Sequence, residues 1–304
     1  MVRNAGVVDL NTKKGIAVGV LCYTVWGLSP AYWNLLISVN SLFILCARIV
    51  FALIFMVCLL AVTGRMQVFR DTLRDKLKMR YLVPASCLIT VNWGMYIWAV
   101  NSGRIFDATL GYYMNPLVAF LLGVIVFREK FSKLQLVAVA LAFVGVLMSV
   151  IAFGRFPILS LSFTFTFASY GVLKKIARAD PIASIAVESL LFTPLALVFA
   201  FGFMTDSVMS VNVTEVLLLI GAGIVTATPL ALYSRAVNDI PYITVGFLHY
   251  ISPSLALTYG FLTGARLTES QIVFFIFIGL ALILFSIELI RNAKKEQIAS
   301  AIRK

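Results

Sequence analysis

The chain alternates between long apolar runs and short polar connections, and few charged side chains interrupt the runs. A helix satisfies its own backbone hydrogen bonds in lipid, so an apolar run of about 20 residues predicts a transmembrane helix. The pattern therefore predicts an all-α membrane protein of ten transmembrane helices. The predicted spans are 15–36, 41–62, 81–100, 108–127, 134–153, 158–174, 183–204, 215–236, 242–264 and 271–290.

Lysine and arginine are distributed unevenly over the connections. When the connections are assigned alternately to two sides, 21 of the 25 basic residues fall on the side of the two termini and three on the other side. The three exceptions are Arg104, Arg155 and Arg266. By the positive-inside rule, both termini are predicted to be cytoplasmic. Residues 1–14 then form a cytoplasmic N-terminal segment, and residues 291–304 form a basic cytoplasmic tail.

Composition agrees with a lipid environment. Hydrophobic residues make up 61% of the chain and charged residues 12%, too little polar surface for a soluble domain of this length. The net charge of +12 would suggest a nucleic-acid partner in a soluble protein. Here the basic residues are concentrated in the connections on one side, so the charge reflects the orientation of the protein in the membrane. We expect a multi-pass protein of the bacterial inner membrane, with the lipid bilayer as a partner and no nucleic acid.

The two halves of the chain resemble each other. Seven identities occur in 25 ungapped positions at a constant offset of 137 residues. The matched pairs are Ala99 and Ala236, Val100 and Val237, Asn101 and Asn238, Tyr113 and Tyr250, Pro116 and Pro253, Ala119 and Ala256, and Gly123 and Gly260. We interpret 15–153 and 158–290 as two five-helix repeats. An odd number of helices inverts the second repeat relative to the first.

Inverted repeats are typical of secondary transporters, because two halves that exchange roles give outward-open and inward-open states of similar energy. The pattern therefore favours a carrier of a small molecule that works by alternating access. A membrane channel is the first alternative. An intramembrane enzyme is the second, and the single histidine and few buried carboxylates make it a weak one.

Four motifs resemble those of RarD-type proteins of the drug/metabolite transporter superfamily, which are also called EamA-domain transporters. They are Asn92–Asn101 (NWGMYIWAVN), Leu110–Leu117 (LGYYMNPL), Arg128-Glu129-Lys130 and Gly246–Pro253 (GFLHYISP). The resemblance covers nearly the whole chain. It implies a ten-helix, two-repeat fold and the export or exchange of small organic molecules such as amino acids, metabolites or chloramphenicol-like drugs.

This chain departs from the family pattern at two places. His249 stands where glutamine is expected before Tyr250. The second half also has no clear match for Glu129, because Arg266 lies near that place and Glu269 follows later.

Arg48 and Glu188 are charged residues that lie inside predicted spans. Arg48 is about 10 Å from the outer end of its helix and Glu188 about 8 Å from the inner end of its own, at 1.5 Å per residue. A buried charge in a membrane is costly unless it faces a cavity or a polar partner. We interpret both as coupling or gating residues, with Arg48 also a possible substrate contact. Snorkelling to the nearest interface is the structural alternative.

Polar and aromatic residues of the third, fourth and ninth spans are candidates for a substrate site near the midplane. The predicted substrate-binding residues are Asn92, Trp93, Tyr96, Tyr112, Asn115, His249, Tyr250 and Ser252. Their rings can stack on a planar or cationic ligand, or they can belong to the interfacial aromatic belt. His249 can carry a proton, or it can form a hydrogen bond between helices.

Three prolines lie within predicted spans, where a missing backbone donor kinks a helix. We expect kinks at Pro116, Pro229 and Pro253 that shape the central cavity. No metal-ligand spacing, nucleotide-binding loop or cofactor motif is present, so we expect no metal, no cofactor and no enzymatic activity. The sequence leaves the oligomeric state open, and ten helices are enough for a monomer to function.

Overall fold

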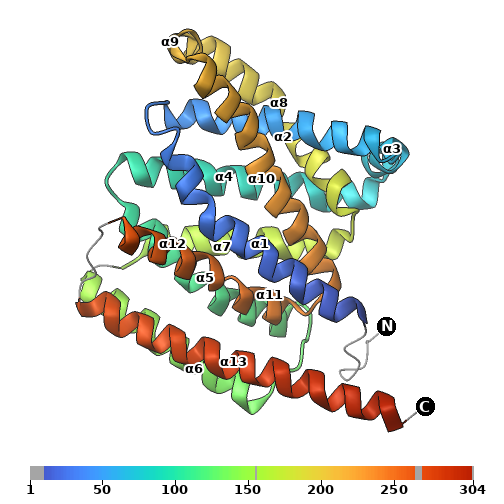
Figure 1. Ribbon diagram of the computed structural model, residues 1–304, viewed down its shortest axis with the longest axis vertical. Helices are drawn as coiled ribbons and strands as arrows, with labels where there is room; N and C mark the ends of the chain where they lie inside the picture. The colour runs from blue at the N-terminus through green and yellow to red at the C-terminus, as the bar shows by residue number, and fades with distance from the viewer. Residues whose placement is uncertain (1–9, 155, 264–268, 303–304) are drawn as a thin grey trace.

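The computed structural model describes residues 10–154, 156–263 and 269–302, and every regular element in these ranges is an α-helix (Figure 1). The helices are α1 (Leu10–Asn34), α2 (Ser41–Val62), α3 (Met66–Arg74), α4 (Lys76–Asn101), α5 (Ile105–Ile125), α6 (Lys133–Phe153), α7 (Ile158–Ala177), α8 (Pro181–Phe203), α9 (Thr205–Ser210), α10 (Val213–Asp239), α11 (Tyr242–Leu248), α12 (Ile251–Leu262) and α13 (Glu269–Ile302).

Eight of the described helices are long and apolar enough to cross a membrane, namely α1, α2, α4, α5, α6, α8, α10 and α13. Two predicted spans are not among them. The span 158–174 coincides with α7, which is rich in serine and threonine and carries Lys174 and Lys175 in its last turn. The span 242–264 is divided into the short helices α11 and α12.

Several helices extend beyond their predicted spans, α4 and α13 among them, and one connection is itself helical. α4 begins at Lys76 rather than at residue 81, and α13 continues to Ile302 rather than ending at 290. The basic connection 63–80 contains α3. The polar ends of α4 and α13 lack the apolar signal that delimits a span, although they continue the same helix.

Side-chain caps explain where several helices start. Asn40 accepts hydrogen bonds from the backbone N–H groups of Leu42 and Phe43 at the start of α2. Asp180 does the same for α8, which has Pro181 in its first turn. Ser132 and Asn212 form reciprocal capping boxes at the starts of α6 and α10. These caps bond backbone donors that a helix cannot satisfy by itself.

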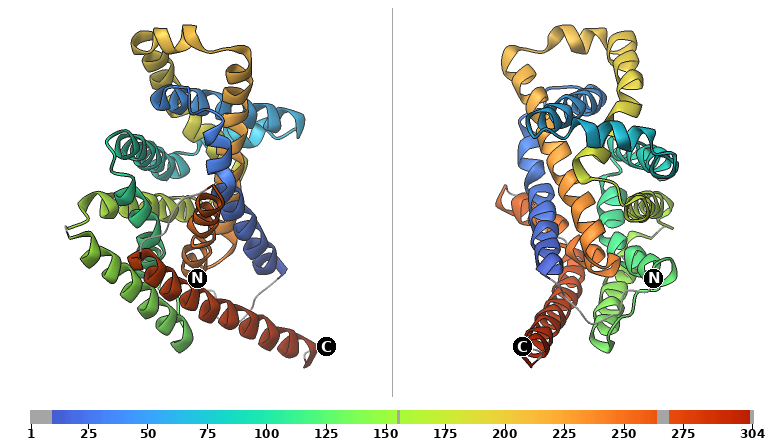
Figure 2. Two further views of the ribbon diagram at one scale, coloured as in Figure 1. Left: turned by 60° about the vertical axis from the view of Figure 1, so that its left-hand side comes forward. Right: turned by 90° about the vertical axis from the view of Figure 1, so that its right-hand side faces the viewer.

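The helices pack in pairs that link distant parts of the sequence. α6 packs along α13 at one edge of the molecule, and α2 packs along α8 and α10 toward the opposite edge (Figures 1 and 2). α7 lies between α4 and α5, and α1 contacts both α10 and α12. The middle of the fold is therefore built from α1, α4, α5, α7, α10 and the α11–α12 pair.

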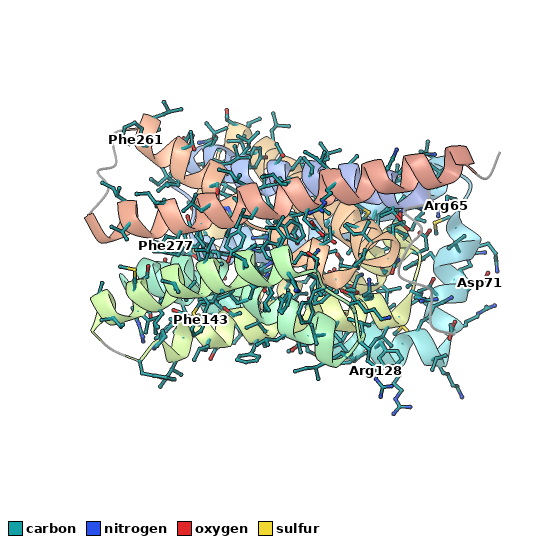
Figure 3. The ribbon with its side chains drawn as sticks, turned by 90° about the horizontal axis from the view of Figure 1, so that it is seen from below. Arg65, Asp71, Arg128, Phe143, Phe261 and Phe277 are labelled. Carbon is teal, nitrogen blue, oxygen red and sulfur yellow. The ribbon has the colours of Figure 1, made fainter. Side chains whose placement is uncertain are left out.

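The bundle has two distinguishable ends. We name the α3 end after α3; there Arg65 forms an ion pair with Asp180. We name the α9 end after α9; there the Ser38 hydroxyl donates to Glu215 at 2.6 Å. In Figure 3 the labelled charged residues Arg65, Asp71 and Arg128 lie toward one end, whereas Phe261 lies toward the other.

The outward surface between the two ends is apolar. Large side chains such as Phe143 on α6, Val198 on α8 and Ile276 on α13 are more than half exposed. Exposed apolar faces along helices of this length are those expected of a protein whose solvent is lipid.

The break between α11 and α12 has a local cause. Pro253 has no backbone N–H, so it cannot donate to the carbonyl of His249 four residues earlier. That carbonyl instead accepts from the N–H of Ser252 at 3.1 Å. His249 follows the last residue of α11, and the proline thus leaves the histidine at a helix junction in the interior.

Candidate functional site

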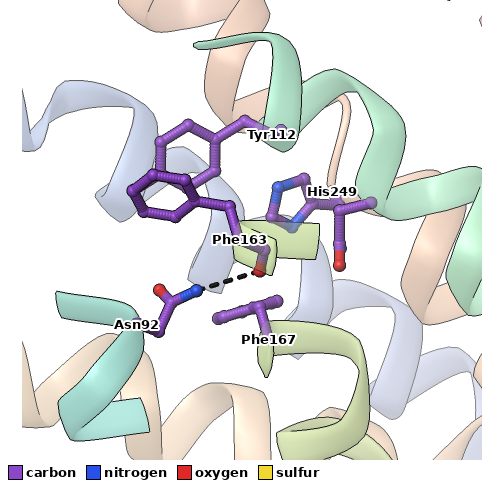
Figure 4. Close-up of a pocket in the computed structure, with 7 residues that line it drawn as sticks. Asn92, Tyr112, Phe163, Phe167 and His249 are labelled. Carbon is purple, nitrogen blue, oxygen red and sulfur yellow. Dashed lines mark hydrogen bonds between the residues drawn. The ribbon is translucent and has the colours of Figure 1, made fainter. Parts of the chain in front are cut away.

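A small enclosed cavity lies among α4, α5, α7 and the junction between α11 and α12 (Figure 4). Its volume is about 10 Å³, room for about one water molecule. The lining residues are Asn92, Gly111, Tyr112, Asn115, Phe163, Phe167 and His249. Four of these, Asn92, Tyr112, Asn115 and His249, belong to the predicted substrate-binding set.

Asn92 joins α4 to α7. Its amide donates to the carbonyl of Phe163 at 2.9 Å and to the hydroxyl of Thr166 at 2.8 Å. The side chain is buried, and Figure 4 shows the bond to Phe163 at the edge of the cavity. Asn92 therefore holds two walls of the cavity together.

His249 and Asn115 are buried but have unsatisfied polar atoms. Both ring nitrogens of His249 and the Oδ1 atom of Asn115 lack a hydrogen-bond partner. The two residues are only 3% and 4% exposed. Buried polar atoms are nearly always bonded, and each exception needs an explanation such as a bound molecule. Both residues line the cavity, so its interior offers hydrogen-bonding groups without partners.

Aromatic rings enclose His249. The Tyr112 ring stacks near the imidazole at 6.1 Å between centroids, with an interplanar angle of 24°. Tyr23 of α1 and Phe167 of α7 contact it edge-on, at 5.1 Å and 5.4 Å. The imidazole is thus held by apolar faces rather than by hydrogen bonds.

A second group of rings extends the wall toward the α9 end. The Tyr96 ring lies 6.1 Å from that of Tyr112 and 6.3 Å from that of Phe163. α5 and α7 approach closely here, because a Cβ atom on Gly111 would lie 2.9 Å from the carbonyl oxygen of Ser160. Only glycine allows this contact, which brings Phe163 against Tyr112.

Arg48 lies beside this wall. Its guanidinium carbon is 4.2 Å from the centre of the Trp93 ring and 5.2 Å from that of Trp33. Arg48 therefore faces the protein interior, which argues against the snorkelling interpretation.

Glu188 lies in a different buried cluster, nearer the α3 end. It forms an ion pair with Lys174, and the Tyr170 hydroxyl donates to it at 3.1 Å. Lys174 also donates to the Ser184 hydroxyl at 2.7 Å. Both members of the pair are buried. Glu188 and Arg48 do not contact each other, and the partner of Glu188 is Lys174, the last residue of the predicted span 158–174.

A second cavity, of about 20 Å³, lies beside Glu188 and among α2, α4, α8 and α10. Its lining residues are Ile49, Ala52, Ile89, Thr90, Trp93, Ile185, Glu188, Ser189, Phe192, Thr226 and Leu230. The hydroxyl of Thr226 has no partner there. Trp93 lines this cavity and also contacts Arg48, so it stands between the two charges.

Two predicted substrate-binding residues lie away from the first cavity. Tyr250 is fully buried in a cluster formed with α5, α6 and α13, and its hydroxyl has no partner. Ser252 is not among the lining residues, and its N–H bonds the His249 carbonyl. Tyr250 directly follows His249, and at about 100° per residue its side chain faces another direction.

The three prolines act in different ways. Pro116 and Pro229 lie inside the continuous helices α5 and α10, whereas Pro253 accompanies the helix break. The Pro229 carbonyl accepts from the Cys22 thiol at 3.2 Å, and the Pro253 carbonyl accepts from the Tyr113 hydroxyl at 3.3 Å. Neither of these two prolines lines the first cavity.

Glu129 has a partner from the other half of the chain. Its carboxylate accepts from the backbone N–H groups of Tyr242 at 2.6 Å and Ile243 at 2.8 Å, at the start of α11. A carboxylate at this place also favours the positive end of the helix dipole. Arg266 lies outside the described residues, as does the side chain of Glu269, so the corresponding site in the second half is not described.

Sequence reasoning did not single out four residues that the structure brings to these clusters. Phe163, Phe167 and Tyr23 surround the cavity and His249, and Lys174 pairs with Glu188. Phenylalanines in an apolar helix carry no signal of the neighbour they face. The serines and threonines of α7 did offer a signal, because Thr164 donates to the Gly111 carbonyl at 2.8 Å and marks α7 as an interior helix.

Comparisons with known proteins give a consistent result. Residues 13–151 match the EamA-like transporter family. Protein RarD of Salmonella typhimurium is 35% identical, over 94% of this chain and 98% of its own length. An uncharacterized transporter of Pseudomonas aeruginosa is also 35% identical, over 94% and 97%. An uncharacterized transporter of Bacillus subtilis is 36% identical, over 90% and 94%.

A solved crystal structure shares the fold, with a TM-score of 0.71 and 16% identity over 89% of this chain and 96% of that chain. The apolar helices and the identity over nearly the full length of several transporters point the same way. The chain belongs to the EamA-like transporter family, among its RarD-type members, and is a multi-pass membrane transporter.

Proposed function

We propose that this protein is a secondary transporter that carries a small organic molecule across the bacterial inner membrane by alternating access, in export or exchange. The proposed substrates are amino acids, metabolites or drugs of similar size. The observation that carries the proposal is the enclosed cavity in which His249 and Asn115 present unpartnered polar atoms. A site of this kind binds a ligand that completes its hydrogen bonds.

The proposal includes ten membrane crossings. α7 supplies the sixth crossing, and its hydroxyl groups are bonded to neighbouring backbone rather than exposed. α11 and α12 together supply the ninth. A broken helix is tolerated at membrane depth where it is buried in protein or lines a cavity, and His249 lies at such a break beside the cavity.

The proposal also includes two inverted repeats, residues 15–153 and 158–290. Asn40 and Asp180 support it, because each caps its helix by accepting from the N–H groups two and three residues later. Helix packing supports it as well. α4 packs on α7 as α10 packs on α1, and α5 packs on α7 as α12 packs on α1. Exchanging each helix for its counterpart in the other repeat reproduces these pairs.

In this arrangement the α3 end faces the cytoplasm, since the positive-inside rule assigns the basic connections to that side. The termini, residues 1–14 and 291–304, are then cytoplasmic. Three interactions at or near this end support a closed inner gate in this state: Arg65 with Asp180, Glu188 with Lys174, and Glu129 with the start of α11. We assign coupling or gating to Glu188, because opening the α3 end must move α7 relative to α8.

The cavity of about 10 Å³ is far smaller than a ligand site of about 300–1,000 Å³. The substrate site therefore forms only when helices move apart. Asn92, Trp93, Tyr96, Tyr112, Asn115 and His249 remain the proposed substrate contacts. We propose no role in substrate binding for Tyr250 and Ser252 beyond their place at the helix junction.

The test is transport by the purified protein in proteoliposomes, with labelled amino acids and small aromatic compounds in the presence and absence of a pH gradient. We expect saturable flux that accelerates when substrate is present on the far side. Asn115→Ala should weaken substrate affinity, since it removes the unpartnered Oδ1 atom. Non-saturating flux without this acceleration would instead identify a channel, and unchanged affinity in Asn115→Ala would remove this residue from the site.

A further inference from the structure

Arg48 is a partly buried cation that has no acidic partner among the residues that the structure describes. It lies seven residues into α2 from the α9 end, about 10 Å along the helix. Its Nε atom is buried and has no hydrogen-bond partner. A guanidinium does not lose its charge in proteins, so this position carries a permanent positive charge within the membrane.

The interior carboxylates with described partners are engaged elsewhere. Glu188 pairs with Lys174, Asp107 with Arg104, and Glu129 with the start of α11. Glu288 is buried on α13, which packs against α6. At the two ends, Asp180 pairs with Arg65 and Glu215 bonds Ser38. Among the ion pairs of the described residues, none joins a carboxylate to Arg48.

Two aromatic rings, rather than a carboxylate, lie against the guanidinium of Arg48. Trp93 and Trp33 lie within 4.2 Å and 5.2 Å of the guanidinium carbon. Cation–π contacts attract the charge but leave its N–H donors unbonded. A cationic ligand would be repelled from this wall, although the aromatic rings alone would suit one.

The Arg48 charge adjoins the cavity wall through α4. Its guanidinium carbon lies 4.2 Å from the Trp93 ring, and the preceding residue, Asn92, lines the cavity. One turn further along α4, the Tyr96 ring lies 6.1 Å from that of Tyr112, which stacks near His249. Arg48 on α2 and Tyr112 on α5 each lie seven residues from the α9 end of their helices.

We propose that Arg48 binds the carboxylate of the transported substrate, and that the substrate is an organic acid with an aromatic or other apolar body seated between Tyr112 and His249. This inference rests on the proposed function and specifies its substrate class. The planar fork of arginine matches a carboxylate and forms paired, charge-assisted hydrogen bonds with it. Asn115 and His249 then bond polar groups on the body of the substrate.

The probes are benzene, indole and naphthalene compounds that each carry a propionate, propionamide or propylammonium chain. These share a body and differ in charge. Binding to the purified full-length protein in lipid nanodiscs is measured by tryptophan fluorescence and by thermal stabilisation. Trp93 and Trp33 lie beside Arg48, so their fluorescence is expected to respond to a ligand bound there. Sodium chloride and sodium phosphate at matched ionic strength test whether any anion suffices.

We expect a propionate to bind, and the propionamide and propylammonium compounds with the same ring to bind at least about tenfold more weakly. Arg48→Gln should weaken propionate binding by about tenfold or more while the affinity for the propionamide stays unchanged. Arg48→Lys keeps the charge without the fork and should give an intermediate affinity. Arg80→Gln, the same substitution at an exposed position of α4, should bind propionate as the unchanged protein does.

Three outcomes would overturn the inference: propionate affinity unchanged in Arg48→Gln, preference for the neutral or cationic chain, or no propionate-selective binding with any ring. An equal response to phosphate would overturn the assignment to an organic acid. Flux of the same probes separates this inference from the proposed function. Anion binding without saturable flux would keep Arg48 as the anion site and contradict the carrier, whereas saturable flux of the propionamide that ignores Arg48→Gln would keep the carrier and overturn the inference.

Discussion

Arg48 and Glu188 occupy comparable places but are stabilised in opposite ways. Each lies seven residues into its helix, Arg48 in α2 after the capping residue Asn40 and Glu188 in α8 after Asp180. Glu188 contacts Lys174 and Tyr170. The guanidinium of Arg48 instead lies over the rings of Trp93 and Trp33, and its buried Nε atom has no hydrogen-bond partner among the described residues.

The difference teaches that a buried charge can serve either closure or recognition. A satisfied ion pair has little to offer a ligand, but it resists separation of the helices that carry it. An unsatisfied cation destabilises the empty protein and gains most when an anion arrives. From this difference we infer that the Glu188 cluster holds helices together near the α3 end, whereas Arg48 is available to bind a ligand nearer the α9 end.

The largest expected effect follows from breaking the satisfied pair. Glu188→Gln leaves the ammonium of Lys174 buried without its counter-charge, and we expect the free energy of unfolding to fall by about 3 kcal/mol. Denaturation of the purified protein in detergent measures this change.

The double variant Lys174→Gln/Glu188→Gln is the control for that measurement. It removes both charges, so it should be more stable than Glu188→Gln alone. A Glu188→Gln protein as stable as the unchanged one would show that the pair contributes nothing to closure, and the comparison with Arg48 would lose its basis.

Asn92 and Asn115 give a matched test of the same idea among uncharged groups. Both are buried to a similar degree, but Asn92 makes two hydrogen bonds to α7 whereas the Oδ1 atom of Asn115 makes none. Asn92→Leu should therefore lose about 1–2 kcal/mol of stability. Asn115→Leu should lose none and instead weaken substrate affinity. Equal stability losses would mean that Asn115 is a structural residue.

Arg48→Gln should change stability less, and in the opposite direction to Glu188→Gln. Removal of an uncompensated charge from the membrane is favourable, whereas loss of the contacts with Trp93 and Trp33 costs about 1–2 kcal/mol. We expect the empty variant to be as stable as the unchanged protein or slightly more stable. A loss as large as that for Glu188→Gln, measured in the same way, would show that Arg48 has a structural partner.

The sequence predicts the helices better than it predicts their partners. Apolar runs delimit helices because lipid leaves the backbone no other bonding arrangement. Asn92, Tyr112, Asn115 and His249 could be singled out because polar residues deep in spans are costly, and the structure brings them to one cavity. Their role in transport stays a prediction.

The failures have equally physical reasons. Lys174 ends an apolar run, so it reads as part of a connection, yet α7 continues to Ala177 and buries it. Its pairing with Glu188 depends on how the turn between α7 and α8 orients the two helices, which hydropathy does not encode. Tyr250 lies away from the first cavity although it directly follows His249, because adjacent residues of a helix face different directions.

The smallest expected effect is at the exposed ion pair of Asp75 and Lys78, which lie 3.1 Å apart between α3 and the first turn of α4. The backbone N–H of Lys78, together with its ammonium, lowers the pKa of Asp75 from its ordinary value. A lowered folded-state pKa contributes stability that is present above the unfolded-state value of about 4 and is lost as the pH falls through the folded-state value.

Asp75→Asn keeps a side chain that can cap α4 and removes only the charge. Its melting temperature should lie slightly below that of the unchanged protein at pH 7. The difference should shrink as the pH falls below about 4 and vanish below the folded-state pKa of Asp75. Solvent screens this pair, so a loss equal to that of Glu188→Gln would show that burial is not what distinguishes the Glu188–Lys174 pair.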